Sequence, residues 1–397
     1  MTDSMRPRAK ATLLGGLYFA QGLPYGFFAL AVPVLLRAEG ASLELVGASS
    51  LLLLPWAAKV LWAPLVDRYG DKRTWILTLQ LLTVVGFAGL ALLNPSRVTE
   101  ALAIAMVGAS FLAATQDVAT DGLATVLLTP EERGWGNGLQ VAAYRLGMIL
   151  GGSALLILYS QGGWRVCFAV MSGLLLFATV PIFIWGHALP RRVPSETAPS
   201  WFSLWDAARI MGPWLGFLAV AKAGDAAASA MVRPYFVDAG WSLDGLAGAL
   251  GFGGSVFGLL GAAIGGGIAT VMSRRRALVT TTTLQAVTVG LLAIGLSIEA
   301  GPWVPMALVW LEDLGSGTAT AAVFAAMMDR CRPGFESTDY TLQASWLVWM
   351  VGFATALSGV SAATFGYVGH LVLCTGLAMF AVVAARFVPA PREVPWN

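Results

Sequence analysis

Charged side chains are scarce in this sequence of 397 residues, because only 12% are Asp, Glu, Lys or Arg while 57% are apolar. In an ordinary soluble domain about a quarter of the residues are charged. The composition therefore excludes a typical water-soluble protein and indicates a membrane protein. Long polar segments are also missing, which argues against the extramembrane domain of a receptor or scaffold.

Cysteine and histidine are nearly absent. The three cysteines, Cys167, Cys331 and Cys374, lie singly and far apart, which argues against a disulfide framework or a thiolate metal site. The two histidines, His187 and His370, lie near the ends of apolar runs. Because no nucleophile, metal cluster or unneutralised pair of acids stands out, we expect no enzymatic activity, no cofactor and no metal.

Long apolar runs make up most of the chain. A helix that spans a bilayer needs about 20 such residues, and twelve runs of this length are separated by short polar breaks. The first run follows a basic leader, but it is too long for a signal peptide and we expect it to be retained. We expect an all-α integral membrane protein whose spans cover residues 12–36, 44–65, 75–93, 100–122, 138–160, 164–188, 207–232, 243–272, 277–297, 303–327, 340–362 and 366–388.

Lys and Arg are concentrated in alternate polar breaks. With both termini in the cytoplasm, sixteen of the 24 basic side chains lie in cytoplasmic segments and only Arg37, Arg97, Arg165 and Arg233 lie in outer loops. Cytoplasmic loops carry the excess of basic residues. We therefore expect a multi-pass protein of the inner (cytoplasmic) membrane with both termini cytoplasmic, since an odd number of helices would destroy this asymmetry.

The largest polar break near the middle reads LPRRVPSETAPSW, from Leu189 to Trp201. It predicts two six-helix bundles, residues 1–188 and 207–397, joined by a cytoplasmic linker at 189–206. The halves also echo each other, because DRYGDKR (Asp67–Arg73) and SRRR (Ser273–Arg276) occupy corresponding breaks. Transporters built from repeated bundles have this layout.

The stretch APLVDRYGDKR, Ala63 to Arg73, resembles the loop between helices two and three of the major facilitator superfamily, with Ala63 in place of the leading Gly. The resemblance implies twelve helices in two pseudo-symmetric bundles. It also implies a gate in which Asp67, Arg68 and Arg73 clamp cytoplasmic helix ends through charge-assisted hydrogen bonds and helix dipoles. The alternative is a simple positive-inside anchor, in which Asp67 would be superfluous.

Two stretches are similar to the AmpG-related branch of this superfamily: KVLWAPLVDRYGDKR (Lys59–Arg73) and ATQDVATDGLATVLLTPEERGWGNGLQVAAYRLGMILGG (Ala114–Gly152). That branch includes muropeptide permeases, acetyl-CoA transporters and siderophore permeases of the RhtX/FptX type. The compact length and the opening YFAQGLPYGFFALAVPVLLR (Tyr18–Arg37) resemble the siderophore permeases most. The resemblance therefore implies proton-driven import of a siderophore or ferric siderophore, with a muropeptide or an acetyl-CoA-type molecule as the alternatives.

Four charged side chains lie within the expected spans of the first half: Lys59, Asp117, Asp121 and Arg145. Charges inside a membrane usually face a cavity or a partner, and these four lie at a similar depth. Asp117 and Asp121 share one helix face, so we expect Lys59 and Arg145 to neutralise them in one network. In the alternative interpretation Arg145 binds an anionic group of the cargo through its planar fork.

In the second half, Lys222 and Asp225 share a helix face, and we expect them to pair, with cargo contact as the alternative. Glu312 and Asp313 lie near the midplane and point about 100° apart. We expect one carboxyl group to face the cavity and the other a neighbouring helix, where Lys222 could be its counter-ion.

A carboxyl group without a fixed partner binds a proton when buried and releases it when wetted, because desolvation favours its neutral form. We therefore predict that Glu312 or Asp313 couples transport to protons, with Asp225 as the next candidate. The alternative is a purely structural carboxylate that is hydrogen-bonded to Ser316.

Residues for cargo binding are expected near GLPYG (Gly22–Gly26), where Pro24 interrupts the first helix. Such interruptions often border a transport site. The cargo-binding candidates are Gln21, Tyr25, Tyr144, Arg145, Trp310 and Trp346, although the tryptophans could equally serve packing. We expect a small-molecule cargo, protons and the lipid bilayer as partners, no nucleic acid, and a monomeric carrier.

Overall fold

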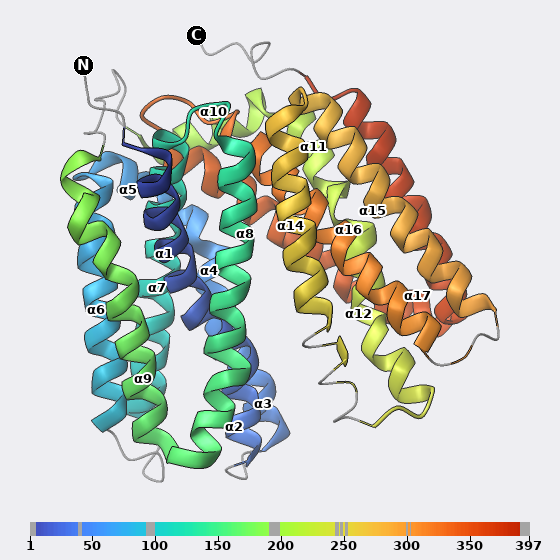
Figure 1. The fold of residues 1–397 in the computed structure, drawn as a ribbon, viewed down its shortest axis with the longest axis horizontal. Helices are drawn as coiled ribbons and strands as arrows, with labels where there is room; N and C mark the ends of the chain where they lie inside the picture. Colours follow the sequence, from blue (N-terminus) through green and yellow to red (C-terminus); the bar gives the residue numbers. More distant parts are fainter. Residues whose placement is uncertain are drawn as a thin grey trace. The chain divides into compact units, whose positions relative to one another are not determined.

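The computed structural model describes residues 5–38, 42–92, 100–189, 199–242, 246, 249–250, 253–298, 301 and 303–389. Within these residues every regular element is a helix (Figure 1). Half of the expected linker, residues 190–198, lies outside the described part of the chain.

In the first half, α-helices alternate with short π-helical and 3₁₀ turns. The helices are α1 (Pro7–Gly26), α2 (Val32–Ala38), α3 (Leu43–Ala48), α4 (Leu54–Ala58), α5 (Ala63–Arg68), α6 (Lys72–Leu92), α7 (Glu100–Leu127), α8 (Arg133–Ile149) and α9 (Leu155–Trp185). The π-helical turns are η1 (Phe27–Ala31) and η5 (Leu150–Ala154), and the 3₁₀ turns are η2 (Ser49–Leu53), η3 (Lys59–Leu61) and η6 (Gly186–Ala188).

The second half contains longer and more regular helices. They are α10 (Trp201–Ile210), α11 (Gly212–Ala221), α12 (Ala223–Asp238), α14 (Gly254–Val271), α15 (Arg274–Ser297), α16 (Trp303–Met328) and α17 (Glu336–Arg386). The expected span 243–272 is described as a helix only from its second third onward, because several residues before α14 lie outside the described ranges.

Each of the twelve expected spans coincides with helical backbone in the described residues. Seven helical elements there are long and apolar enough to cross a membrane. Two of them, Arg133–Ala188 and Glu336–Arg386, are each divided by a glycine with φ of 69°, Gly163 and Gly366. This conformation is open almost only to glycine. Because each of these two elements supplies two spans, the seven elements account for nine of the twelve. The other three spans are α7, α16 and the interrupted helical segment Leu43–Arg68.

Interruptions in the first two spans follow from proline. Pro24 lies inside α1, and the π-helical turn η1 follows it directly. A proline removes one backbone donor and prevents a regular helical hydrogen bond. In the second span Pro55 and Pro64 each lie in the first turn of a short helix, and the 3₁₀ turn η3 between these helices begins with Lys59.

The chain forms two compact units. The first comprises Met1–Leu127, Ala142–Ser203 and Cys331–Thr341, and the second comprises Leu128–Val141, Leu204–Arg330 and Leu342–Asn397. The first turns of α8 therefore belong to the second unit, and the first turns of α17 belong to the first. In the first unit α1, α6, α7 and α9 pack side by side, and in the second unit α14 and α15 pack on α16 (Figure 1).

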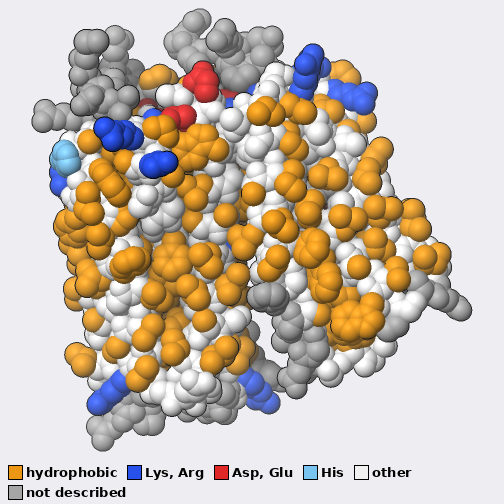
Figure 2. Space-filling view, viewed as in Figure 1, with side chains coloured by type: hydrophobic (Ala, Val, Ile, Leu, Met, Phe, Trp, Pro, Cys, Tyr) orange, Lys and Arg blue, Asp and Glu red, His pale blue; other side chains and the backbone are white. Residues whose placement is uncertain are grey.

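Hydrophobic side chains cover the sides of the helices in each unit, and Lys and Arg gather near the helix ends (Figure 2). Among the exposed apolar side chains are Phe177, Phe353 and Phe380. Without a polar solvent along their sides, such helices are held together by close packing of small residues rather than by hydrophobic burial alone.

Glycines bring the backbones of α14 and α16 into direct contact. A Cβ atom at Gly261 or Gly265 would collide with the carbonyl oxygen of Leu314 or Thr318, and one at Gly317 would collide with that of Gly258. In the first unit Gly22 and Gly26 of α1 meet the backbone of α8 in the same way. These contacts hold the two central helices of each unit in register.

We predict that Gly265→Ala destabilises the protein, whereas Gly267→Ala does not. The added methyl group at Gly265 must push α14 from α16, and overpacking of this kind costs about 1–3 kcal/mol. A Cβ at Gly267 meets no atom within 4 Å, so this neighbour is a matched control. Thermal unfolding in detergent would measure both changes, and equal midpoints would contradict the close contact.

Candidate functional site

A buried charge cluster lies in the first unit. Lys59 of η3 forms an ion pair with Asp117 of α7, and its Nζ lies 3.8 Å from Oδ2 of Asp121 one turn further on. The Tyr18 hydroxyl of α1 donates to Asp121 Oδ1 at 3.1 Å. All four side chains are buried. One cation thus lies between two carboxylates, and a tyrosine that sequence reasoning missed supplies a further donor.

Arg145 of α8 does not join this cluster. Its side chain is half-buried and forms no hydrogen bond or ion pair with any described residue. The expected four-membered network therefore contains Lys59, Asp117 and Asp121 in this structure, with Tyr18 in place of Arg145. Because the Arg145 guanidinium group has no hydrogen bond or ion pair with the described residues, it is available to bind a ligand.

Aromatic side chains from three helices meet next to this cluster. The ring of Tyr25 lies 5.3 Å from that of Trp56 in an edge-on arrangement and 5.8 Å from that of Tyr144. The close approach of α1 and α8 brings the two tyrosines together, because Gly22 packs on the backbone of Tyr144. Both tyrosines lie within electrostatic reach of Asp117.

Two polar groups beside these rings are buried without a hydrogen-bond partner among the described residues. They are the side-chain amide of Gln21 and the indole Nε1 of Trp56. Burying such a group unpaired costs about 1–3 kcal/mol. Buried polar groups are normally satisfied, so these two groups are suited to hydrogen-bond a polar ligand.

A second polar network lies in the second unit, around the break between α11 and α12. Lys222 Nζ lies 2.6 Å from Asp225 Oδ2 and also donates to Gln285 Oε1 at 3.0 Å and to Ser316 Oγ at 2.9 Å. The Ser316 hydroxyl donates to Asp225 at 3.0 Å. Lys222 thus forms its ion pair with Asp225, and Ser316 serves these two residues rather than Glu312.

Glu312 and Asp313 point to different helices. Glu312 is 1% exposed and accepts hydrogen bonds from Ser229 of α12 at 3.2 and 3.3 Å. Its carboxyl group also interacts with that of Asp225. Asp313 is half-buried and faces α14, where a Cβ at Gly254 would lie 2.5 Å from its Oδ2. Glu312 thus faces α12, whereas Asp313 faces α14.

Asp67, at the end of α5, binds the start of α17 within the first unit. It accepts hydrogen bonds from the backbone N–H of Ser337 at 3.2 Å and of Thr338 at 2.7 Å, and from the Thr338 hydroxyl at 2.7 Å. Lys72 lies 3.2 Å from Asp67 and 3.3 Å from Glu336. The first N–H groups of a helix lack internal partners and carry positive charge, which a carboxylate neutralises.

The two expected arginines of this loop lie elsewhere. Arg68 lies over the ring of Tyr69 at 5.4 Å, and the Arg73 side chain packs against Gly186. The cation beside Asp67 is Lys72, which sequence reasoning passed over although it stands in the same DRYGDKR motif.

A corresponding cluster in the second unit was not foreseen. Asp329, after α16, accepts a hydrogen bond from Arg133 at 2.8 Å and also binds Arg274. Arg274 further donates to the carbonyl oxygens of Ala269 and Pro130. Part of the signal was present in the sequence, since Arg274 belongs to the break SRRR that echoes DRYGDKR.

The two candidate tryptophans have their N–H groups satisfied by backbone carbonyls. Trp310 Nε1 donates to Ala249 at 2.8 Å, and Trp346 Nε1 donates to Leu215 at 2.9 Å. The ring of Trp310 stacks on Phe257 with centroids 5.7 Å apart. These contacts fit a packing role as well as a site wall.

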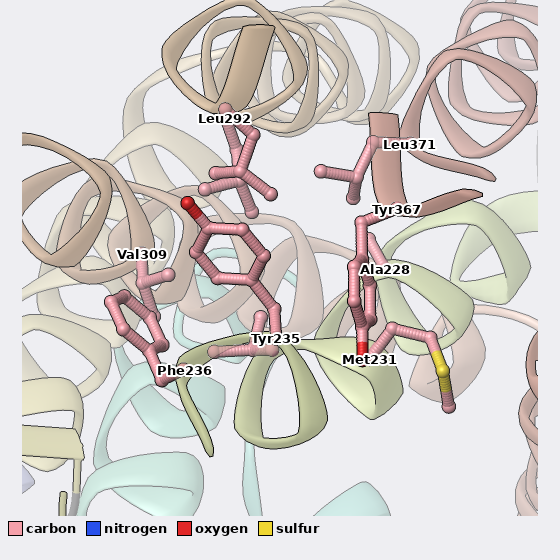
Figure 3. A pocket seen from close by; sticks show the side chains of 10 residues that line it. Ala228, Met231, Tyr235, Phe236, Leu292, Val309, Tyr367 and Leu371 are labelled. Atoms are coloured by element: carbon pink, nitrogen blue, oxygen red, sulfur yellow. The ribbon is translucent and has the colours of Figure 1, made fainter. Parts of the chain in front are cut away.

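A small apolar pocket in the second unit is lined by Tyr235, Phe236, Leu292, Tyr367 and Leu371, among others (Figure 3). Its volume of about 10 Å³ is that of about one water molecule, too small for a cargo molecule. Within the described residues no group of three or more His, Cys, Asp or Glu could hold a metal ion.

Comparison with known proteins identifies the family. Residues 14–354 match the Major Facilitator Superfamily. The anhydromuropeptide permease of Escherichia coli (strain K12) is 30% identical over 404 residues, which cover 92% of this chain and 80% of that protein. The putative transporter AmpG 4 of Rickettsia felis is 22% identical over 94% of both chains.

A solved structure shows the same architecture. The transporter FucP, crystallised in the outward conformation, superposes with a TM-score of 0.73 at 14% identity, over 96% of this chain and 98% of that one. At this identity the likeness concerns the fold alone. The predicted all-α transporter fold is thereby confirmed. This chain belongs to the major facilitator superfamily and is a multi-pass membrane transporter similar to AmpG-type permeases.

Proposed function

We propose that this protein is a proton-coupled importer of a sugar–peptide of the anhydromuropeptide class, working by alternating access in the inner membrane. The observation that carries the proposal is the 30% identity to an anhydromuropeptide permease along 92% of the chain. The sequence analysis favoured a siderophore, and the relatives described above give that cargo no support. They favour the sugar–peptide alternative instead.

The side chains of the first unit suit such a cargo. A sugar–peptide offers ring faces, hydroxyl and amide groups, and carboxylates. Tyr25, Trp56 and Tyr144 provide aromatic surface, and the unpaired amide of Gln21 can exchange hydrogen bonds with hydroxyl or amide groups. Arg145 can bind a peptide carboxylate in a bidentate way.

For the coupling proton we propose Glu312, with Asp225 as the group that shares it. Glu312 is buried but is capped by Ser229, whose side chain is exposed. A small rearrangement at Ser229 would therefore wet the carboxyl group and release its proton. Lys222 holds Asp225 ionised, so protonation and deprotonation fall on Glu312.

For the loop between α5 and α6 we propose a gating role. The hydrogen bonds of Asp67 hold the first turn of α17, and the rest of this helix, from Leu342 onward, belongs to the second unit. A transporter that alternates between two states has to make and break such bonds. We further propose that the carrier works as a monomer with both termini in the cytoplasm.

The cargo is tested by transport into proteoliposomes that contain the purified protein. We expect accumulation of a radiolabelled anhydro-disaccharide peptide when the outside is made acidic, and none without the pH gradient or in liposomes without protein. A ferric siderophore should not accumulate in the same vesicles. Accumulation of the siderophore but not of the sugar–peptide would reverse the assignment.

Replacing Glu312 by Gln should abolish accumulation driven by the pH gradient while sparing cargo exchange across the membrane. The amide mimics the protonated carboxyl group, so the loaded carrier can still change conformation but cannot release a proton. Asp313→Asn, one residue on, should keep accumulation, because Asp313 faces α14 and not Asp225. The opposite pattern would assign the coupling proton to Asp313.

Lys59→Met should strongly reduce the yield of folded protein, because it leaves Asp117 and Asp121 buried without their cation. Breaking a buried pair costs about 3–5 kcal/mol. The double change Lys59→Met with Asp117→Asn should restore part of the yield. Arg145→Gln should instead leave the yield unchanged and weaken cargo uptake. A loss of folding in Arg145→Gln equal to that in Lys59→Met would place Arg145 in the network after all.

A further inference from the structure

The second unit contains a buried histidine that none of the roles above uses. His370 lies on α17, four residues after the break at Gly366, and is 1% exposed. The other histidine of the chain, His187, is exposed in η6. Ionisable side chains inside membrane spans are costly and usually functional.

Both ring nitrogens of His370 have a partner. Nε2 lies 3.0 Å from the carbonyl oxygen of Ala227 in α12, and Nδ1 lies 2.6 Å from the Ser361 hydroxyl. A carbonyl oxygen can only accept, so the hydrogen of the neutral ring is on Nε2. Nδ1 is then an acceptor, and the Ser361 hydroxyl donates to it.

Ser361 has a second acceptor within reach, the carbonyl oxygen of Ser358 at 3.0 Å. If the ring binds a proton at Nδ1, this N–H can donate to the Ser361 oxygen, while the Ser361 hydrogen turns to Ser358. Ala227 keeps its hydrogen bond throughout. The ring can thus change its charge without leaving any buried polar group unpaired, which would otherwise cost about 1–3 kcal/mol.

Cys374, one helical turn further on, also lies beside the ring, with its sulfur 3.4 Å from Nε2. The charged side chains of the neighbouring helices are Lys222, Asp225, Arg233 and Asp238 at α12 and Glu312 and Asp313 on α16, and α15 has no ionisable side chain between Ala277 and Ser297.

We propose that His370 is a second proton-binding site of the carrier, which takes one proton at Nδ1. The proposal rests on the proton coupling proposed above. The proton comes from water, raises the ring charge by one, and leaves again as the carrier returns. Ser361 is the positioning residue that allows both charge forms.

The proton on His370 can be observed directly by nitrogen NMR. The variant His187→Gln retains a single histidine, so a ¹⁵N-histidine-labelled sample in lipid nanodiscs reports on His370 alone. Between about pH 8 and pH 5, the range in which histidine changes charge, we expect one protonated ring nitrogen to become two. A ring that keeps one protonated nitrogen over the whole range would overturn the proposal.

Two serine variants test the hydrogen-bond switch. In Ser361→Ala the charged ring loses its acceptor, so we expect half-protonation to require about tenfold more protons, since bonds to charged groups are the stronger ones. Ser358→Ala is the matched control, because its hydroxyl binds Thr355 and its backbone carbonyl remains. Equal titrations of the two variants would contradict the role of Ser361.

A transport assay provides a second test of the role of His370. His370→Gln, which keeps one donor and one acceptor, should lose the acceleration of uptake at acidic outside pH while cargo exchange continues. An unchanged pH dependence would exclude a role in transport. If the cargo assignment itself is wrong, the unaltered protein will not take up the sugar–peptide, and the NMR titration, which needs no cargo, still decides the protonation of His370.

Discussion

The cost of placing an ionised side chain in an apolar environment governs the arrangement of this transporter. A charge at the bilayer centre costs several kcal/mol, and the cost falls only when a partner or a proton neutralises it. Lys59 lies between Asp117 and Asp121, and Lys222 is paired with Asp225. Glu312 is buried and accepts hydrogen bonds from Ser229, and it forms no ion pair with a cation among the described residues.

Close helix contacts determine where these groups can act. Glycines remove the side chains that would keep backbones apart, and the helices on both sides then present their polar residues to the same region. In the first unit this contact places Tyr25 beside Tyr144, and in the second it lets Asp313 face α14. The arrangement of the polar residues therefore depends on glycines, which have no functional group in a side chain.

Each unit also has a carboxylate at a helix end that binds helix ends far from it in the sequence. Asp67 binds the start of α17, and Asp329 binds Arg133 at the start of α8 and Arg274 at the start of α15.

The sequence alone was sufficient to predict the membrane class, the twelve spans, the superfamily and most of the charged candidates. Hydropathy and the four-residue spacing of two acids are properties of the local sequence. Because folding does not change them, they can be predicted without the tertiary structure. The partners of these residues were not predictable. Asp67 pairs with Lys72, Asp121 binds Tyr18, Glu312 binds Ser229, and Arg145 forms no ion pair with the described residues. Which side chain reaches a charge is decided by helix crossings and interruptions in three dimensions, and only the tertiary structure contains that information.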